Sequence, residues 1–192
     1  LDDSMPLRDG VILSIDEESK FGMKVAANSI LYTNITGFDG ITLGYAQKAD
    51  GSHSGAPDGS EAPAVDQPWV FFGNTGMHQT ATPITYNRED ATLNMDGWQV
   101  IWNGITIPMN GDPENFPEDT GVATITCENK CGHGESYTIE YLAHVQLGDP
   151  SGFGSVEYSF IITGTINDPN FEAVTEEHDN TTEEEDNTIE EN

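Results

Sequence analysis

Carboxylates are the residues of this sequence best suited to chemistry, and they gather in two loops rich in Gly and Pro. The loops span residues 49–67 and 110–121. Ca²⁺ prefers six to eight oxygen ligands from carboxylates, amide groups and backbone carbonyls on a flexible loop, and both loops supply them. The candidate Ca²⁺ ligands are Asp58, Glu61 and Asp66 in the first loop and Asp112, Glu114 and Asp119 in the second.

The spacing of these acids matches neither the helix–loop–helix calcium loop nor a repeat-type calcium motif. An alternative interpretation is that the Asp side chains only cap backbone amides in solvated turns. The two interpretations differ in whether the carboxylates face an ion or the N–H groups of their own loop.

A second cluster with chemical potential is the pair Cys127 and Cys131, followed by His133. The cysteines flank the tip of a predicted hairpin, where a disulfide would fix the turn with a modest entropic gain. The alternative is tetrahedral Zn²⁺ coordination, with His144 or His78 as the fourth ligand. Because zinc cysteines usually come as C-x2-C or in fours, and no second pair exists, we predict a Cys127–Cys131 disulfide.

The sequence contains no recognisable catalytic signature. We find no Gly-x-Ser-x-Gly elbow, phosphate-binding loop, dinucleotide fingerprint or metalloprotease helix motif. We therefore expect a protein that is not an enzyme, although acids this numerous leave a glycosidase-type carboxylate pair open. Trp98 and Trp102 share one side of a predicted strand, where they form either part of the core or an aromatic platform for sugars.

The charge balance excludes several classes of partner. Against 34 Asp and Glu the chain has six Lys and Arg, which gives a net charge of −28. Nucleic acids and anionic membranes need a basic surface, so we expect neither as a partner. Ten of the acids lie in residues 172–192, and the remaining 24 acids against six bases still leave −18 on residues 1–171. Three explanations of this acidic excess stay open: the chain binds Ca²⁺, it works in high salt, or its charge only keeps it soluble.

The secondary-structure elements that position the acidic loops, the cysteines and the tryptophans are predicted to be strands. Short β-branched and aromatic runs alternate with Gly, Asn, Asp and Pro clusters, which predicts an all-β antiparallel β-sandwich, jelly-roll-like, with long Gly/Pro/Asp-rich loops. An Asp96-Gly97 pair predicts a type I′ hairpin. The predicted strands are residues 11–15, 29–33, 40–46, 69–72, 84–86, 92–95, 99–102, 122–127, 137–146 and 155–166.

We divide the chain into an N-terminal extension or exchanged strand (residues 1–20), a β-sandwich domain (21–171) and an acidic tail (172–192). The first strand is followed by an acidic stretch, so it either pairs within its own domain or completes the sheet of a neighbouring copy. The residues of this candidate assembly strand are Val11, Ile12, Leu13 and Ile15.

Three segments carry a resemblance: residues 51–63 (GSHSGAPDGSEAP), 68–78 (PWVFFGNTGMH) and 149–154 (DPSGFG). Over residues 21–166 the chain resembles an uncharacterised group of exported bacterial proteins, some with PEP-CTERM-type sorting tails. The resemblance implies export and placement at the cell surface or in a matrix, and it supplies no catalytic residues. Such a sorting tail has an apolar segment and a basic cluster, whereas this chain has a polyacidic segment.

Together these features predict an extracellular structural or assembly protein, a subunit of a surface filament, sheath or matrix that is stabilised by Ca²⁺. We expect a homo-oligomer or polymer, secreted or at the cell surface. No run approaches the 18 apolar residues of a membrane span, so we expect no membrane insertion. The alternative function is a secreted carbohydrate-binding module.

Overall fold

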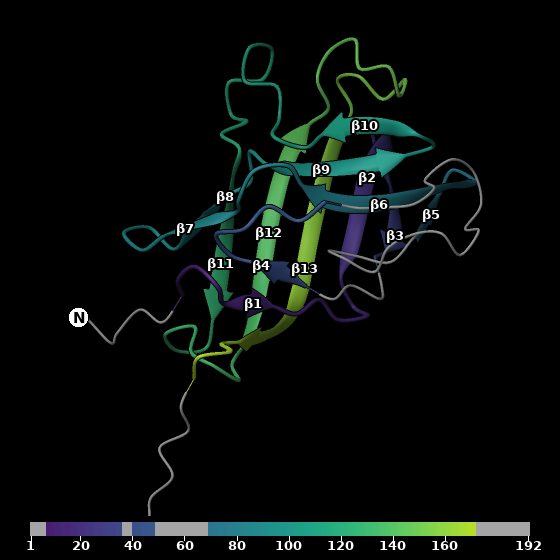
Figure 1. Ribbon diagram of the computed structural model, residues 1–192. Coiled ribbons are helices and arrows are strands. Elements are labelled where there is room, and N and C mark those ends of the chain that lie inside the picture. The colour runs from purple at the N-terminus through teal and green to yellow at the C-terminus, as the bar shows by residue number, and fades with distance from the viewer. Residues whose placement is uncertain (1–6, 36–39, 49–68, 172–192) are drawn as a thin grey trace, which may run out of the picture.

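The computed structural model describes residues 7–35, 40–48 and 69–171, which form two antiparallel β-sheets packed face to face (Figure 1). The predicted all-β antiparallel sandwich is confirmed. Across the larger sheet the strands are β3 (Ser29–Asn34), β2 (Lys20–Ala26), β13 (Glu157–Asn167), β12 (Ser136–His144), β11 (Val122–Cys127), β8 (Thr92–Asn94) and β7 (Thr85–Asn87). Two short strands, β1 (Ile12–Leu13) and β4 (Ile41–Thr42), continue this sheet beside β13. The smaller sheet runs β10 (Ile105–Pro108), β9 (Trp98–Trp102), β6 (Asn74–Thr80) and β5 (Trp69–Phe71).

Strict alternation explains the centre of the larger sheet. In β12 the side chains of Tyr137, Ile139 and Tyr141 are buried between the sheets, while Glu140 and Leu142 face outward. The period of two places every second residue on the same face of a strand. The strands predicted at residues 122–127, 137–146 and 155–166 form where they were expected, as β11, β12 and β13.

Aromatic rings fill the space between the two sheets. The Trp98 ring stacks on the His78 ring with centroids 4.8 Å apart, and the Phe160 ring meets both rings edge-on. Phe21 lies 4.9 Å from Phe160. Trp98, Phe160 and His78 have no measurable exposure to solvent. Offset and edge-to-face pairs of this kind add to the free energy gained from burial of the rings.

Three strands were not predicted from the sequence, namely β2, β6 and β10. Strand β6 is the most instructive, because its sequence NTGMHQT is polar and contains a glycine. Met77 and His78 are neighbours and point to opposite faces of the strand, yet both are fully buried. A strand covered on both faces shows no alternation of polar and apolar residues, so the sequence pattern gave no signal for it.

The predicted hairpin at Asp96-Gly97 is wrong. Strand β8 pairs with β7 and β11 in the larger sheet, whereas β9 pairs with β6 and β10 in the smaller one. The dipeptide is the crossover between the sheets. Met95 and Trp98 on either side of it are both fully buried. A turn does form at Asp96-Gly97, since the Trp98 N–H donates to the Met95 carbonyl oxygen at 2.9 Å, but it carries the chain from one sheet to the other and does not join two paired strands.

The first predicted strand belongs to the sheet of its own chain. Strand β1 pairs with β13 on one side and with β4 on the other. Val11, Leu13 and Ile15 are buried in the common core, and Ile12 is partly buried. Leu7 is also buried there, so the sandwich already includes Leu7 and does not begin at residue 21. Alternate burial of these side chains ties the segment to its own core and corrects the boundary expected at residue 20.

Candidate functional site

A cleft of about 690 Å³ opens at one end of the sandwich, between the loop of residues 110–121 and the loop that joins β12 to β13. Both loops project from the same end of the sheets (Figure 1). The residues that line the cleft are Asp96, Asn110, Gly111, Asp112, Pro113, Glu114, Asn115, Asp119, Thr120, Gln146 and Leu147. Most of these side chains carry oxygen, and none is Lys or Arg.

Asp119 fastens the loop to the end of β12. Its Oδ2 accepts hydrogen bonds from the backbone N–H groups of Asp112, at 3.0 Å, and His144, at 2.8 Å. Its Oδ1 lies 3.0 Å from His144 Nδ1. The Asp119 side chain is 1% exposed. A buried carboxylate is stable only when its oxygens find donors of this kind, so Asp119 supports the shape of the loop.

Asp112 closes the other side of the loop. Its Oδ2 accepts hydrogen bonds from Asn115 Nδ2, at 2.8 Å, and from the backbone N–H of Leu147, at 3.1 Å. These bonds, with the Asn115 side chain contributing most, hold the pKa of the Asp112 carboxyl below its ordinary value of 3.8. Asp112 and Asp119 thus do what the capping interpretation of this loop predicts.

His144 is held between the loop and the sheet. Its side chain lies on the outward face of β12, but the Phe116 ring stacks on it with centroids 3.6 Å apart and an interplanar angle of 4°. On the other side, His144 Nε2 is 3.8 Å from Glu157 Oε2. Glu118, Asp119 and His144 each offer a ligand atom within 4.8 Å of the others, so this acidic cluster can hold a metal ion.

Two exposed carboxylates complete the cleft. Asp96 and Glu114 make no ion pair with Lys or Arg within the described parts of the chain. Asp96 Oδ1 and the Asn110 carbonyl oxygen both lie close to Gly121, whose φ is +69°. A Cβ at this position would lie 2.5 Å from Asp96 Oδ1 and 3.4 Å from the Asn110 carbonyl oxygen. Only glycine fits this backbone conformation and spacing without strain. A carboxylate and a carbonyl therefore converge at the cleft.

The structure brings together only part of the predicted ligand set. Asp112, Glu114 and Asp119 line one cleft, while Asp58, Glu61 and Asp66 lie outside the described residues. The sequence did not identify Asp96, His144 or Glu157 as members of the site. Those members come from other segments of the chain, and no local spacing links them to residues 110–121.

The cysteine and tryptophan predictions have clear outcomes. Cys127 and Cys131 form a disulfide with a Cα–Cα distance of 5.3 Å, as predicted, so neither sulfur is available for zinc. Trp98 and Trp102 are buried in the core, with exposed fractions of 0% and 8%. The core interpretation of these two tryptophans is therefore confirmed, and the alternative of a sugar platform built on them is wrong.

Acid should remove the contribution of the Asp112 hydrogen bonds to the stability of the fold. The folded-state pKa of Asp112 is lowered, so its contribution to stability is complete above the ordinary value of 3.8 and is lost as the pH falls below it. We expect the difference in unfolding free energy between the wild type and Asp112→Asn to narrow below about pH 4. Urea titrations of both proteins at a series of pH values measure this difference, and a constant difference would contradict the assignment.

No family model, no curated protein and no solved structure matches the chain. Among the described residues, no helix is long and apolar enough to cross a membrane.

Proposed function

We propose that this protein is a non-enzymatic, extracellular structural or assembly protein whose acidic cleft binds Ca²⁺. The observation that carries the proposal is the cleft between residues 110–121 and the β12–β13 loop, which is lined by carboxylate, amide and hydroxyl oxygens without a basic residue. Oxygen donors of mixed type on loops are the ligands that Ca²⁺ prefers. The ion would be held by Asp96 and Glu114, with the Asn110 carbonyl as a further donor.

Charge supplies the reason for a cation. At −28, two copies of the chain repel each other, and association requires that counter-ions reduce this charge. Ca²⁺ at the cleft would neutralise carboxylates that have no basic partner in the described structure. We propose that the ion thereby permits association of copies into a filament, sheath or matrix.

The disulfide supports an extracellular location. Disulfides persist in oxidising compartments such as the cell exterior and are rare in the cytosol. The Cys127–Cys131 bond spans the turn between β11 and β12. Secretion into an oxidising compartment is the simplest reason for the two cysteines of this chain to be joined in a disulfide.

Calcium should raise the melting temperature of the protein. A ligand that binds only the folded state stabilises it by mass action, by about 1.4 kcal/mol at ten times the dissociation constant. For a chain of this size, that corresponds to a rise of about 3–6 °C, reversed by a chelator. Calorimetric scans with Ca²⁺, with Mg²⁺ and with chelator measure the effect.

Paired variants locate the ion. We expect Asp96→Asn combined with Glu114→Gln to abolish the calcium-dependent shift, because both unpaired carboxylates of the cleft are removed. The matched control is Glu17→Gln combined with Glu18→Gln, which removes two exposed acids from the β1–β2 connection and should keep the full shift. An unchanged melting temperature of the wild type in Ca²⁺ would refute the proposal. Light scattering with and without Ca²⁺ tests assembly separately.

A further inference from the structure

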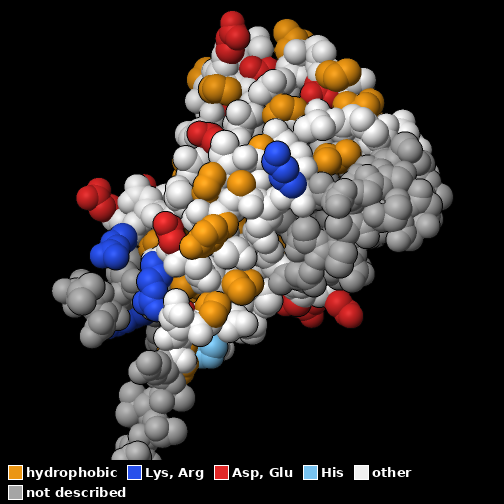
Figure 2. Space-filling model, in the orientation of Figure 1, with side chains coloured by type: hydrophobic (Ala, Val, Ile, Leu, Met, Phe, Trp, Pro, Cys, Tyr) orange, Lys and Arg blue, Asp and Glu red, His pale blue; other side chains and the backbone are white. Residues whose placement is uncertain are grey.

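The few basic residues of this chain are not spread evenly. Arg8 and Arg88 line one pocket of about 390 Å³, together with Leu7, Asp9, Thr85 and Tyr86. Figure 2 shows Lys and Arg side chains gathered at this corner of the visible face. Two of the six basic residues of a chain with net charge −28 therefore share one hollow.

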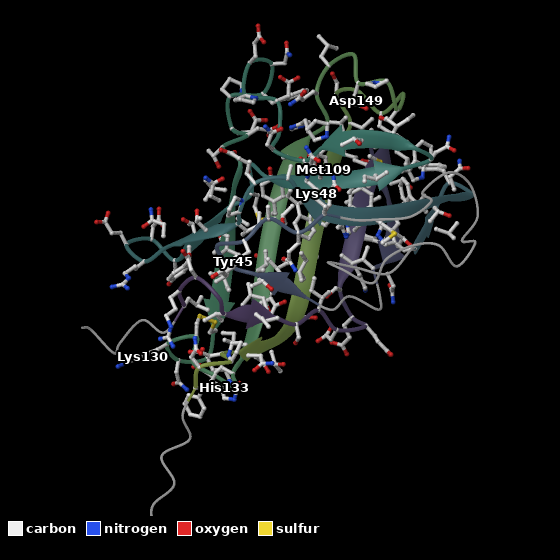
Figure 3. The ribbon with its side chains drawn as sticks, viewed as in Figure 1. Tyr45, Lys48, Met109, Lys130, His133 and Asp149 are labelled. Atoms are coloured by element: carbon white, nitrogen blue, oxygen red, sulfur yellow. A yellow bond between two sulfur atoms is a disulfide. The ribbon has the colours of Figure 1, made fainter. Side chains whose placement is uncertain are left out.

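A third basic residue, Lys130, lies at the same end of the molecule as His133 (Figure 3). Both belong to the turn that joins β11 to β12, and both are exposed. His133 is linked to Arg8 through Asp168, because Asp168 donates its backbone N–H to His133 Nδ1 and its carboxylate binds Arg8. We call Arg8, Arg88 and Lys130 the basic corner.

The basic corner already binds one carboxylate. Arg8 Nη2 lies 2.7 Å from Asp168 Oδ2, and the Asp168 side chain is only 8% exposed. Arg8 itself remains 52% exposed, so its guanidinium keeps donors free for a second acceptor. Arg88 is exposed and makes no ion pair with any carboxylate of the described residues. The corner thus has unused capacity for anions.

The chain leaves the sandwich at this corner. Phe171 stacks on the His133 ring, with centroids 4.4 Å apart and an interplanar angle of 14°. Its backbone N–H also donates to the Asp168 carbonyl oxygen at 3.0 Å. The next residue is Glu172, the first of ten acids in a segment, residues 172–192, that has no Lys or Arg. The most acidic segment of the chain is therefore covalently attached beside its basic corner.

We propose that residues 172–192 bind to the basic corner of the same chain through salt bridges from their carboxylates to Arg8, Arg88 and Lys130. Each exposed salt bridge contributes little to the free energy of binding on its own. Attachment at Phe171 gives the segment an effective concentration of about millimolar order, so weak contacts suffice. The contact depends on charge and is screened by salt.

Carbodiimide cross-linking of the intact protein tests this contact. The reagent joins a carboxylate to a lysine amine without a spacer, and the described chain offers Lys20, Lys24 and Lys48 as internal controls beside Lys130. At low salt, we expect cross-links from Lys130 to residues 172–192 within one chain, several-fold more often than from the other three lysines. We also expect about 1 M NaCl to suppress them.

Charge reversal completes the test. Arg88→Glu should lower the yield of the Lys130 cross-link several-fold, while Lys24→Glu, the same charge change on β2, should leave it unchanged. Equal yields from all four lysines, insensitivity to Arg88→Glu, or cross-links that join two chains at micromolar concentration would overturn the proposal. The result does not depend on Ca²⁺, so it stands or falls independently of the proposed function.

Discussion

Acidification below pH 6.5 should lower the unfolding free energy of the protein through a single side chain, His78. Its ring is fully buried and packs against Trp69, Trp98 and Phe160. Burial removes the charged form from water and lowers the pKa of His78 well below 6.5.

The direction of the effect follows from the proton count. In the unfolded chain His78 titrates near its ordinary pKa of 6.5, whereas in the folded chain it stays neutral to much lower pH. Its contribution to stability is therefore complete above pH 6.5 and is lost as the pH falls toward the folded-state pKa. Each full pH unit inside that window costs about 1.4 kcal/mol of unfolding free energy.

Urea unfolding of the wild type and of His78→Phe at pH 7, 6 and 5 measures the effect. The phenyl ring keeps an aromatic partner for Trp98 and cannot take up a proton, so the variant should lose the slope between pH 6.5 and pH 5. Met77→Leu is the control, because it changes the neighbouring buried side chain of β6 without removing a titratable group and should leave the slope intact. Parallel curves for His78→Phe and wild type would show that His78 does not control this slope.

Gly164→Ala should destabilise the protein by about 3 kcal/mol, as an overpacked site with no room to relax. Gly164 lies in β13 opposite Tyr137 of β12, and a Cβ there would stand 1.8 Å from the Ser14 carbonyl oxygen. That carbonyl also accepts a hydrogen bond from the Tyr137 hydroxyl. The new methyl group would collide with the backbone at Ser14 on one side and with the buried Tyr137 ring on the other.

The melting temperature of Gly164→Ala is expected to fall by about 6–12 °C. The control is Gly134→Ala, where the backbone is at φ +85° but a Cβ meets no atom within 4 Å, so the cost is about 1 kcal/mol. If Gly164→Ala were as mild as this control, residues 11–16 would not pack against β13 as described. The comparison also tests whether the first predicted strand belongs to its own chain.

The strands that could be predicted from the sequence are those in which buried and exposed side chains alternate. Strands β11, β12 and β13 show a period of two because one face is buried and the other is not. Strand β6 was missed because both Met77 and His78 are buried, and the Asp96-Gly97 crossover was misread because a local turn signal does not reveal which sheet each neighbour joins.

The candidate site was predicted in the same partial way. Asp112, Glu114 and Asp119 were found because one loop carries them all. Asp96 lies at the crossover between the two sheets and His144 at the end of β12, so only the folded chain brings them close to this loop. Their spacing in the sequence does not indicate that they are neighbours. The role of Asp119 as an acceptor for three N–H groups also depends on His144 at the end of β12, which lies 25 residues away in sequence.

Asp112 and Asp119 give the loop of residues 110–121 a rigidity that does not depend on any ion. Their oxygens are already occupied by Asn115, Leu147 and His144, so the walls of the cleft are in place before a cation arrives. A ligand that meets such walls spends little of its binding free energy on ordering the chain. Binding of a cation to the cleft would therefore follow a simple saturation curve, as at a preorganised receptor. The heat-capacity change of binding would be small, because no part of the loop folds when the cation binds.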